Sequence, residues 1–201
     1  MFTMGITGGS GSGKTSALLA LNKLGALVID CDTVYHELLA ENAEIKSELA
    51  ARFDGVLQNG AIDRKRLGEI VFKNKASLND LNAITHKYVG AEIERRLAEW
   101  AVKGGAVAAI DAILLIESSR SKKCDVTVGI IAPVETRIAR ITSRDGITRA
   151  QAEMRINAQK PDSFFIENCD HILENTYASP EEFENKCEDF FAQLIGGHID
   201  A

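Results

Sequence analysis

The sequence predicts an α/β fold: a three-layer sandwich on a five-stranded parallel sheet, with a helical insertion and a lid. Three observations predict it. Five short apolar stretches are spread along the chain, the first of them runs directly into a glycine-rich loop and a helix, and residues 33–103 carry a mostly helical pattern. Strands separated by helices favour a parallel sheet. The helical stretch is far longer than the roughly twelve residues that a crossover needs, which indicates an insertion.

The first strand, residues 2–7, leads into residues 8–15, GGSGSGKT, which fit the phosphate-binding P-loop pattern G-x-x-x-x-G-K-[ST]. Glycines let consecutive backbone amides close round a polyphosphate, and Lys14 adds a positive charge that reaches the β- and γ-phosphates. The Thr15 hydroxyl would bind Mg²⁺, which prefers oxygen ligands. A helix over residues 16–24 supplies the positive end of its dipole. The order of strand, loop and helix favours a nucleotide site of the P-loop NTPase fold over an inert glycine-rich turn.

The second strand, residues 26–32, ends in two acids, Asp30 and Asp32. Ligands of a parallel sheet bind at the carboxyl ends of its strands, so both acids are expected at the edge that carries the P-loop. Alternation places both on one side if the strand persists. Asp32 fits two roles at this point, the N-cap of a helix over residues 33–40 or a general base or ligand of metal-bound water.

Helical spacing continues over residues 43–53, 63–72 and 77–102, with turns at residues 54–55 and 59–60. We assign residues 33–103 to a helical region that binds a second substrate. Residues 1–32, 104–147 and 168–201 form the expected nucleotide-binding core. Its third strand, residues 106–111, ends in Asp111, which resembles the Walker-B acid that orients magnesium or its waters; a capping or salt-bridged role is the alternative. The fourth and fifth strands cover residues 125–132 and 171–175.

Arginines gather between the last two strands. Pro133 opens a helix that places Arg137, Arg140 and Arg144 on one face, and a second helix, which carries Arg155, begins at residue 148 with a capping box. Guanidinium groups fit phosphate oxygens and stabilise the charge that develops in phosphoryl transfer. We therefore expect residues 133–167, which overlap the core, to form a lid rather than a solvated helical face.

The composition of the chain indicates in which compartment the protein works and what it binds. A net charge of −6 argues against a basic nucleic-acid surface, and no apolar run approaches membrane-spanning length. No signal peptide is apparent, and the four cysteines are widely spaced, which suggests free thiols in a reducing compartment. We expect a cytoplasmic protein that binds neither nucleic acid nor membranes and is a monomer or weak homo-oligomer.

Taken in order, these motifs resemble the dephospho-CoA kinase family over nearly the whole chain. The P-loop alone is unspecific, whereas residues 63–72, DRKRLGEIVF, are distinctive. The other matching positions are residues 28–32 with His36, residues 84–86, Asp111 with residues 114–115 and Glu117, Arg155 with Gln159, and residues 170–175.

The resemblance implies ATP-dependent phosphorylation of the ribose 3′-hydroxyl of dephospho-CoA, with Mg²⁺ accompanying ATP. Asp32 would accept the hydroxyl proton, and Lys14 and Arg140 would be the other catalytic residues. Asn175 would lie near the adenine. The implied ATP-binding residues are Gly9, Ser10, Gly11, Ser12, Gly13, Lys14, Thr15, Ser16, Arg144 and Asn175. The acceptor side would comprise Asp32, His36, Leu67, Ile70, Phe72, His86 and Asp111, and the metal would be held by Thr15 and, through water, by Asp111.

Several positions depart from the family pattern, three of them near the acceptor: Lys87 stands where proline usually follows the histidine, and Ile113 and Ile116 replace a proline and an aromatic residue. These changes concern the acceptor, so two alternatives stay open. One is a kinase of another nucleoside or nucleotide, against which residues 67–72 argue. The other is a nucleotide-binding switch, against which the paired acids and the absence of a guanine-reading Asn-Lys-x-Asp motif argue.

Overall fold

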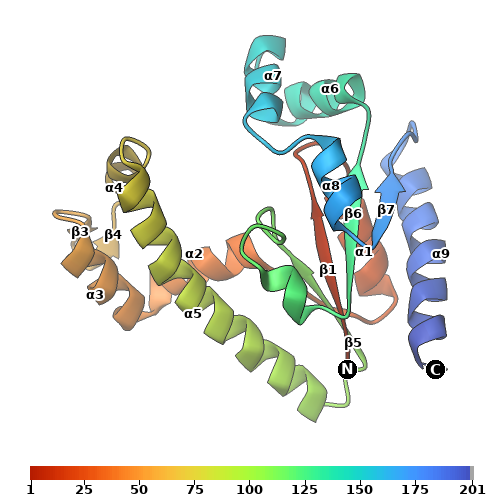
Figure 1. Cartoon of the computed structure of the whole chain (residues 1–201), viewed down its shortest axis with the longest axis horizontal. Helices are drawn as coiled ribbons and strands as arrows, with labels where there is room; N and C mark the ends of the chain where they lie inside the picture. Colours follow the sequence, from red (N-terminus) through yellow and green to blue (C-terminus); the bar gives the residue numbers. More distant parts are fainter. Residues whose placement is uncertain (200–201) are drawn as a thin grey trace. The chain divides into compact units, whose positions relative to one another are not determined.

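The computed structural model describes residues 1–199 and is drawn in Figure 1. The chain folds into two compact units. One contains Met1–Ile29 together with the chain from Trp100 onward, and the other is Asp30–Glu99. Within the described residues, no helix is long and apolar enough to cross a membrane.

The first unit is built on a five-stranded sheet with the strand order β2-β5-β1-β6-β7. Its strands are β1 (Phe2–Gly8), β2 (Leu27–Asp30), β5 (Val107–Asp111), β6 (Val126–Ile131) and β7 (His171–Glu174). The central strand β1 pairs in parallel with β5 and β6, and β6 pairs in parallel with β7. Every residue of β1 is buried, as expected for a strand covered on both faces. The predicted α/β fold with a five-stranded parallel sheet is confirmed.

Helices α1 (Lys14–Lys23) and α9 (Pro180–Ile199) lie side by side (Figure 1). They share one apolar core with β1, to which α9 contributes the fully buried Phe183 and Phe191. The remaining helices of this unit are α6 (Val134–Asp145), α7 (Arg149–Asn157), α8 (Asp162–Asn168) and a short 3-10 turn, η1 (Arg120–Lys123). Helix α8 contacts β6 and buries Phe165; the sequence pattern did not indicate it.

The second unit comprises α2 (Cys31–Glu41), α3 (Ala43–Arg52), β3 (Leu57–Gln58), β4 (Ala61–Ile62), α4 (Arg64–Val71) and most of α5 (Lys75–Val102). Its core is a separate cluster that includes Ile45, Leu49 and Phe53. Strands β3 and β4 form a small antiparallel hairpin, where the sequence indicated only turns between helices. Asn59 and Gly60 both have positive φ, which is what a two-residue hairpin turn requires.

Candidate active site

The P-loop lies between the buried strand β1 and helix α1. Gly11 and Gly13 have φ values of 77° and 110°, in the region that side chains with a Cβ rarely adopt. Gly13 is the N-cap of α1 and offers no side chain to its amides, and the first turn carries no acidic residue. The positive end of α1 is therefore left for an anion.

The Lys14 ammonium group and the Thr15 hydroxyl group of the P-loop motif lie in different surroundings. The Lys14 ammonium folds back over the loop and donates to the carbonyl oxygen of Gly8 at 3.0 Å. Thr15 is exposed in the first turn of α1, whereas Ser16 is buried with 8% of its surface exposed. Of these two neighbouring hydroxyls, that of Thr15 is the one accessible to a metal–phosphate group.

Arg140 and Asn175 support the P-loop from the side of its carbonyl groups. Arg140 donates to the carbonyl oxygen of Gly11 at 3.2 Å and to the Asn175 amide oxygen at 3.1 Å. Asn175 is 2% exposed and donates to the carbonyl oxygen of Ser12 at 2.9 Å. A further bond from Arg140 reaches the Tyr177 carbonyl at 3.1 Å. In this conformation the Arg140 guanidinium donates its hydrogen bonds to oxygen atoms of the protein itself.

The lid helices present a pair of arginines that share one carboxylate. Arg144, near the end of α6, donates to Asp145 at 2.6 Å, and Arg155 of α7 is hydrogen-bonded to the same carboxylate. The hydrogen bond from Arg144 and the one from Arg155 hold the pKa of Asp145 at about 2. Two guanidinium groups and one ionised carboxylate leave a net positive charge on this face, which suits phosphate oxygens.

Asp111 is the half-buried last residue of β5. In the sheet it pairs with Ile6, two residues before the strand gives way to the loop at Gly8. The register therefore brings this carboxylate to the edge of the sheet where the P-loop begins.

Asp30 and Asp32 have separate roles in the second unit. Asp30 is the N-cap of α2, because its carboxylate accepts from the backbone N–H of Asp32 at 2.8 Å and of Thr33 at 3.2 Å. The expectation that the strand continues to Asp32 was wrong, since this cap ends β2 at Asp30 and starts α2 at Cys31. Asp32 is exposed in the first turn, and within residues 1–199 its carboxylate makes no hydrogen bond.

The other residues expected on the acceptor side differ in exposure. Leu67 is 3% exposed and belongs to the core of the second unit, with Ile70 packed against it. Phe72, in contrast, is 85% exposed just after α4, and His86 is exposed on α5. His36 lies one turn after Asp32 on α2, and its Nε2 is 3.4 Å from a guanidinium nitrogen of Arg64. The exposed members can meet a ligand without unpacking the unit, whereas Leu67 cannot.

A sequence model of dephospho-CoA kinase matches residues 2–181 of this chain. The chain belongs to the dephospho-CoA kinase family. The dephospho-CoA kinase of Geobacter sulfurreducens is 36% identical over 195 residues, which cover 96% of this chain and 98% of that protein. That of Thermobifida fusca is also 36% identical, over 96% of both chains.

Solved structures share this fold, and one of them is a dephospho-CoA kinase. The Campylobacter jejuni dephospho-CoA kinase superposes with a TM-score of 0.71 at 27% identity, covering 98% of each chain. A crystal structure of a Thermus thermophilus protein gives a TM-score of 0.78 at 30% identity, over 96% of this chain and 97% of that one. A shikimate kinase from Acinetobacter baumannii shares the fold, with a TM-score of 0.56 at 17% identity.

In this member of the dephospho-CoA kinase family, Lys87 takes part in a contact between α5 and α3. Its ammonium lies 2.9 Å from a Glu48 carboxylate oxygen, which also accepts from the Tyr88 hydroxyl at 2.7 Å. The two bonds lower the pKa of Glu48, the one from Lys87 more strongly. The residue that departs from the family pattern therefore has a structural partner within its own unit.

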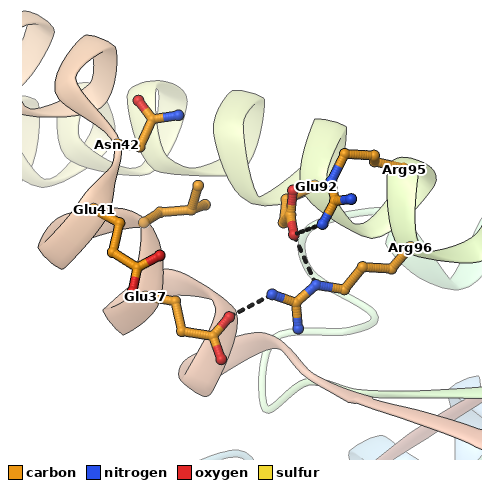
Figure 2. A pocket seen from close by; sticks show the side chains of 7 residues that line it. Glu37, Glu41, Asn42, Glu92, Arg95 and Arg96 are labelled. Atoms are coloured by element: carbon orange, nitrogen blue, oxygen red, sulfur yellow. Dashed lines mark hydrogen bonds and ion pairs between the residues drawn. The ribbon is translucent and has the colours of Figure 1, made fainter.

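Sequence reasoning also missed a pocket of about 320 Å³ in the second unit, between α2 and α5. Figure 2 shows that its charged side chains face one another across the opening. Arg96 joins Glu37 of α2 to Glu92 of α5, and Arg95 donates to Glu92. The hydrogen bond from Arg95 and that from Arg96 hold the pKa of Glu92 at about 2. The lining is Glu37, Leu38, Glu41, Asn42, Glu92, Arg95 and Arg96, none of which was expected at the site.

Proposed function

We propose that this chain catalyses transfer of the γ-phosphoryl group of ATP to the ribose 3′-hydroxyl of dephospho-CoA, giving CoA and ADP. The family match over residues 2–181 carries the proposal, because it spans both the P-loop and the second unit with its distinctive residues 63–72. A nucleotide-binding switch without an acceptor would not need that second unit.

On the ATP side, the phosphates would be held by the Lys14 ammonium and by P-loop amides between Gly9 and Ser16 other than that of Ser10, whose N–H donates to Gln159. Mg²⁺ would be held by the exposed Thr15 hydroxyl and, through water, by Asp111 at the neighbouring strand end. Such an ion typically takes few protein ligands and several waters, so one hydroxyl and one carboxylate fit it. When bound, it would neutralise phosphate charge.

The arginines divide between support and contact. Arg140 and Asn175 would shape the loop from its carbonyl side, with Asn175 close to the adenine. The Arg144–Arg155 pair would meet the phosphates when the lid is over them, exchanging part of its bond to Asp145 for phosphate oxygens. A catalytic role for Arg140 stays a prediction, and it would require the guanidinium to give up one of its present carbonyl partners.

On the acceptor side, Asp32 would take the proton from the ribose 3′-hydroxyl. The hydroxyl oxygen then bonds to the γ-phosphorus of ATP, and the bond between the γ-phosphorus and the β,γ-bridging oxygen breaks. Its carboxylate is available for this because Asp30 already caps the helix. His36, Ile70, Phe72 and His86 would contact the rest of the acceptor, with Leu67 supporting them from the core.

We also propose a cellular compartment and an oligomeric state for the protein. The four cysteines are free thiols, which fits a reducing cytoplasm. The acidic net charge of −6 fits a protein that binds nucleotides locally rather than nucleic acid, and we propose a monomer or weak homo-oligomer.

The test is direct. The purified protein is incubated with ATP, magnesium and dephospho-CoA, and products are identified by mass; parallel reactions contain adenosine, AMP or shikimate. We expect an increase of one phosphoryl group on dephospho-CoA alone. Phosphorylation of another acceptor in preference would replace the proposed substrate, and ATP hydrolysis with no phosphorylated acceptor would favour a switch.

A further inference from the structure

Among the charged residues in the described part of the chain, Arg137 alone is buried, with 2% of its surface exposed. Burial lowers the pKa of its guanidinium, and the nearby Asp162 carboxylate opposes that effect. The Asp162 oxygen lies 3.2 Å away on a side chain that is itself 31% exposed. Taking a guanidinium out of water is costly, and one half-exposed partner offsets only part of that cost. The position of Arg137 therefore calls for a reason other than this ion pair.

The other donors of Arg137 are directed at the tip of the P-loop. Its Nε donates to the Ser10 carbonyl oxygen at 2.9 Å, and its Nη2 donates to the Gln159 side-chain oxygen at 3.2 Å. That same oxygen of Gln159 accepts from the Ser10 backbone N–H at 2.8 Å. The Gln159 amide nitrogen donates to the Ser10 hydroxyl, also at 2.8 Å. Two side chains far along the sequence thus hold all three polar groups of Ser10.

The loop lies directly against this arginine. A Cβ atom at Gly9 would stand 2.2 Å from Arg137 Nη2, and one at Gly11 would stand 2.9 Å from the Arg137 carbonyl oxygen. Both distances are shorter than real Cβ contacts allow. The glycines therefore also let the loop pack on the start of α6.

A glycine-rich loop has many accessible conformations, and phosphoryl transfer needs its amides fixed in advance. We propose that Arg137 and Gln159 are positioning residues that hold the P-loop in the shape that receives the phosphates of ATP. This inference rests on the proposed kinase function. Gln159 follows α7 and Asp162 begins α8. The hydrogen bonds of Arg137 and Gln159 therefore also link the segment between these two helices to the P-loop.

The experiment measures the dissociation constant for ATP by calorimetry without any acceptor, so it does not depend on which acceptor is correct. The first variant is Gln159→Leu, which removes the two bonds to Ser10 and the one from Arg137 and keeps a side chain of similar bulk. Gln193→Leu, an exposed glutamine on α9, is the matched control. Ser10→Ala and Arg137→Lys remove the hydroxyl contact and the forked geometry, respectively.

We expect Gln159→Leu to weaken ATP binding by about tenfold or more, since it removes two neutral hydrogen bonds to Ser10 and one from the Arg137 guanidinium. Its melting temperature should fall only modestly below that of the control, because one donor of the buried Arg137 loses its partner, and KM for the acceptor should stay within about twofold. Arg137→Lys should weaken ATP binding at least as much, and Ser10→Ala less. Unchanged or tighter ATP binding in a folded Gln159→Leu protein would overturn the proposal, because Gln159 would then be irrelevant or would obstruct the loop.

Discussion

The Asp30 carboxylate accepts hydrogen bonds from the backbone amide of Asp32, 2.8 Å away, and from that of Thr33. One acid of the pair therefore caps α2, and the other is left exposed in the first turn of that helix. The sequence left both roles open for Asp32. The structure excludes the cap, because Asp30 already fills it. The Asp32 carboxylate is therefore available to accept a proton from a bound hydroxyl group.

Because Asp30 caps α2, two substitutions of Asp30 should differ in their effect on the stability of the protein. Asp30→Ala should lower the free energy of unfolding by about 1 kcal/mol, since it leaves two helix amides unsatisfied. Asp30→Asn should cost little, because asparagine caps as well as aspartate. Denaturant titration of both variants checks this, and equal stabilities would mean that the Asp30 bonds contribute nothing measurable.

Two substitutions of Thr15 separate the effect of its hydroxyl group on activity from the effect of its side-chain size. Thr15→Ser keeps the metal-binding oxygen and should retain most activity, whereas Thr15→Val should lose about a hundredfold or more in kcat. Removing magnesium with EDTA should abolish turnover in every variant, and added magnesium should restore it. If Thr15→Val matched Thr15→Ser at all magnesium concentrations, Thr15 would not be a ligand.

The lid offers a matched pair of arginines on α7. Arg155→Met removes a guanidinium from the pair around Asp145, and kcat/KM should fall by about ten- to a hundredfold, the worth of a charge-assisted hydrogen bond. Arg149→Met is the control, because Arg149 is exposed and ion-paired with Glu135 and Glu153. Equal losses in the two variants would show a general effect of charge on α7 rather than contact with ATP.

Substitution of Phe72 should weaken binding of the acceptor without lowering the stability of the fold. Since it is 85% exposed, Phe72→Ala should leave the melting temperature unchanged while raising KM for dephospho-CoA. Phe53→Ala, in the core of the same unit, should cost about 3–5 kcal/mol of stability. An unchanged KM in Phe72→Ala would remove Phe72 from the acceptor site.

The sheet and the P-loop were predictable because each strand is a short, buried apolar run and the loop motif has fixed spacing. The hairpin at residues 57–62 and helix α8 were not, because strands of two residues and a helix of seven carry too little periodicity. Strand order is set by packing across the sheet and leaves no trace in any one segment.

Among the site residues, the arginines show where sequence reasoning ends. Arg137, Arg140 and Arg144 share one helical face by spacing, yet the first is buried, the second supports the P-loop and the third is exposed. Helical spacing gives the direction of a side chain but not what covers it. The loop that covers Arg137 comes from the other end of the unit's sequence, at residues 9–11.

The role of Asp32 as the general base is tested by comparing Asp32→Asn with the unaltered protein, in turnover of dephospho-CoA and in ATP affinity. The carboxamide keeps the size of the side chain and removes its basicity. We expect kcat to fall by about 10²- to 10⁴-fold, the usual contribution of a general base, with the dissociation constant for ATP unchanged. Turnover within a few-fold of the unaltered protein would show that Asp32 does not accept the proton.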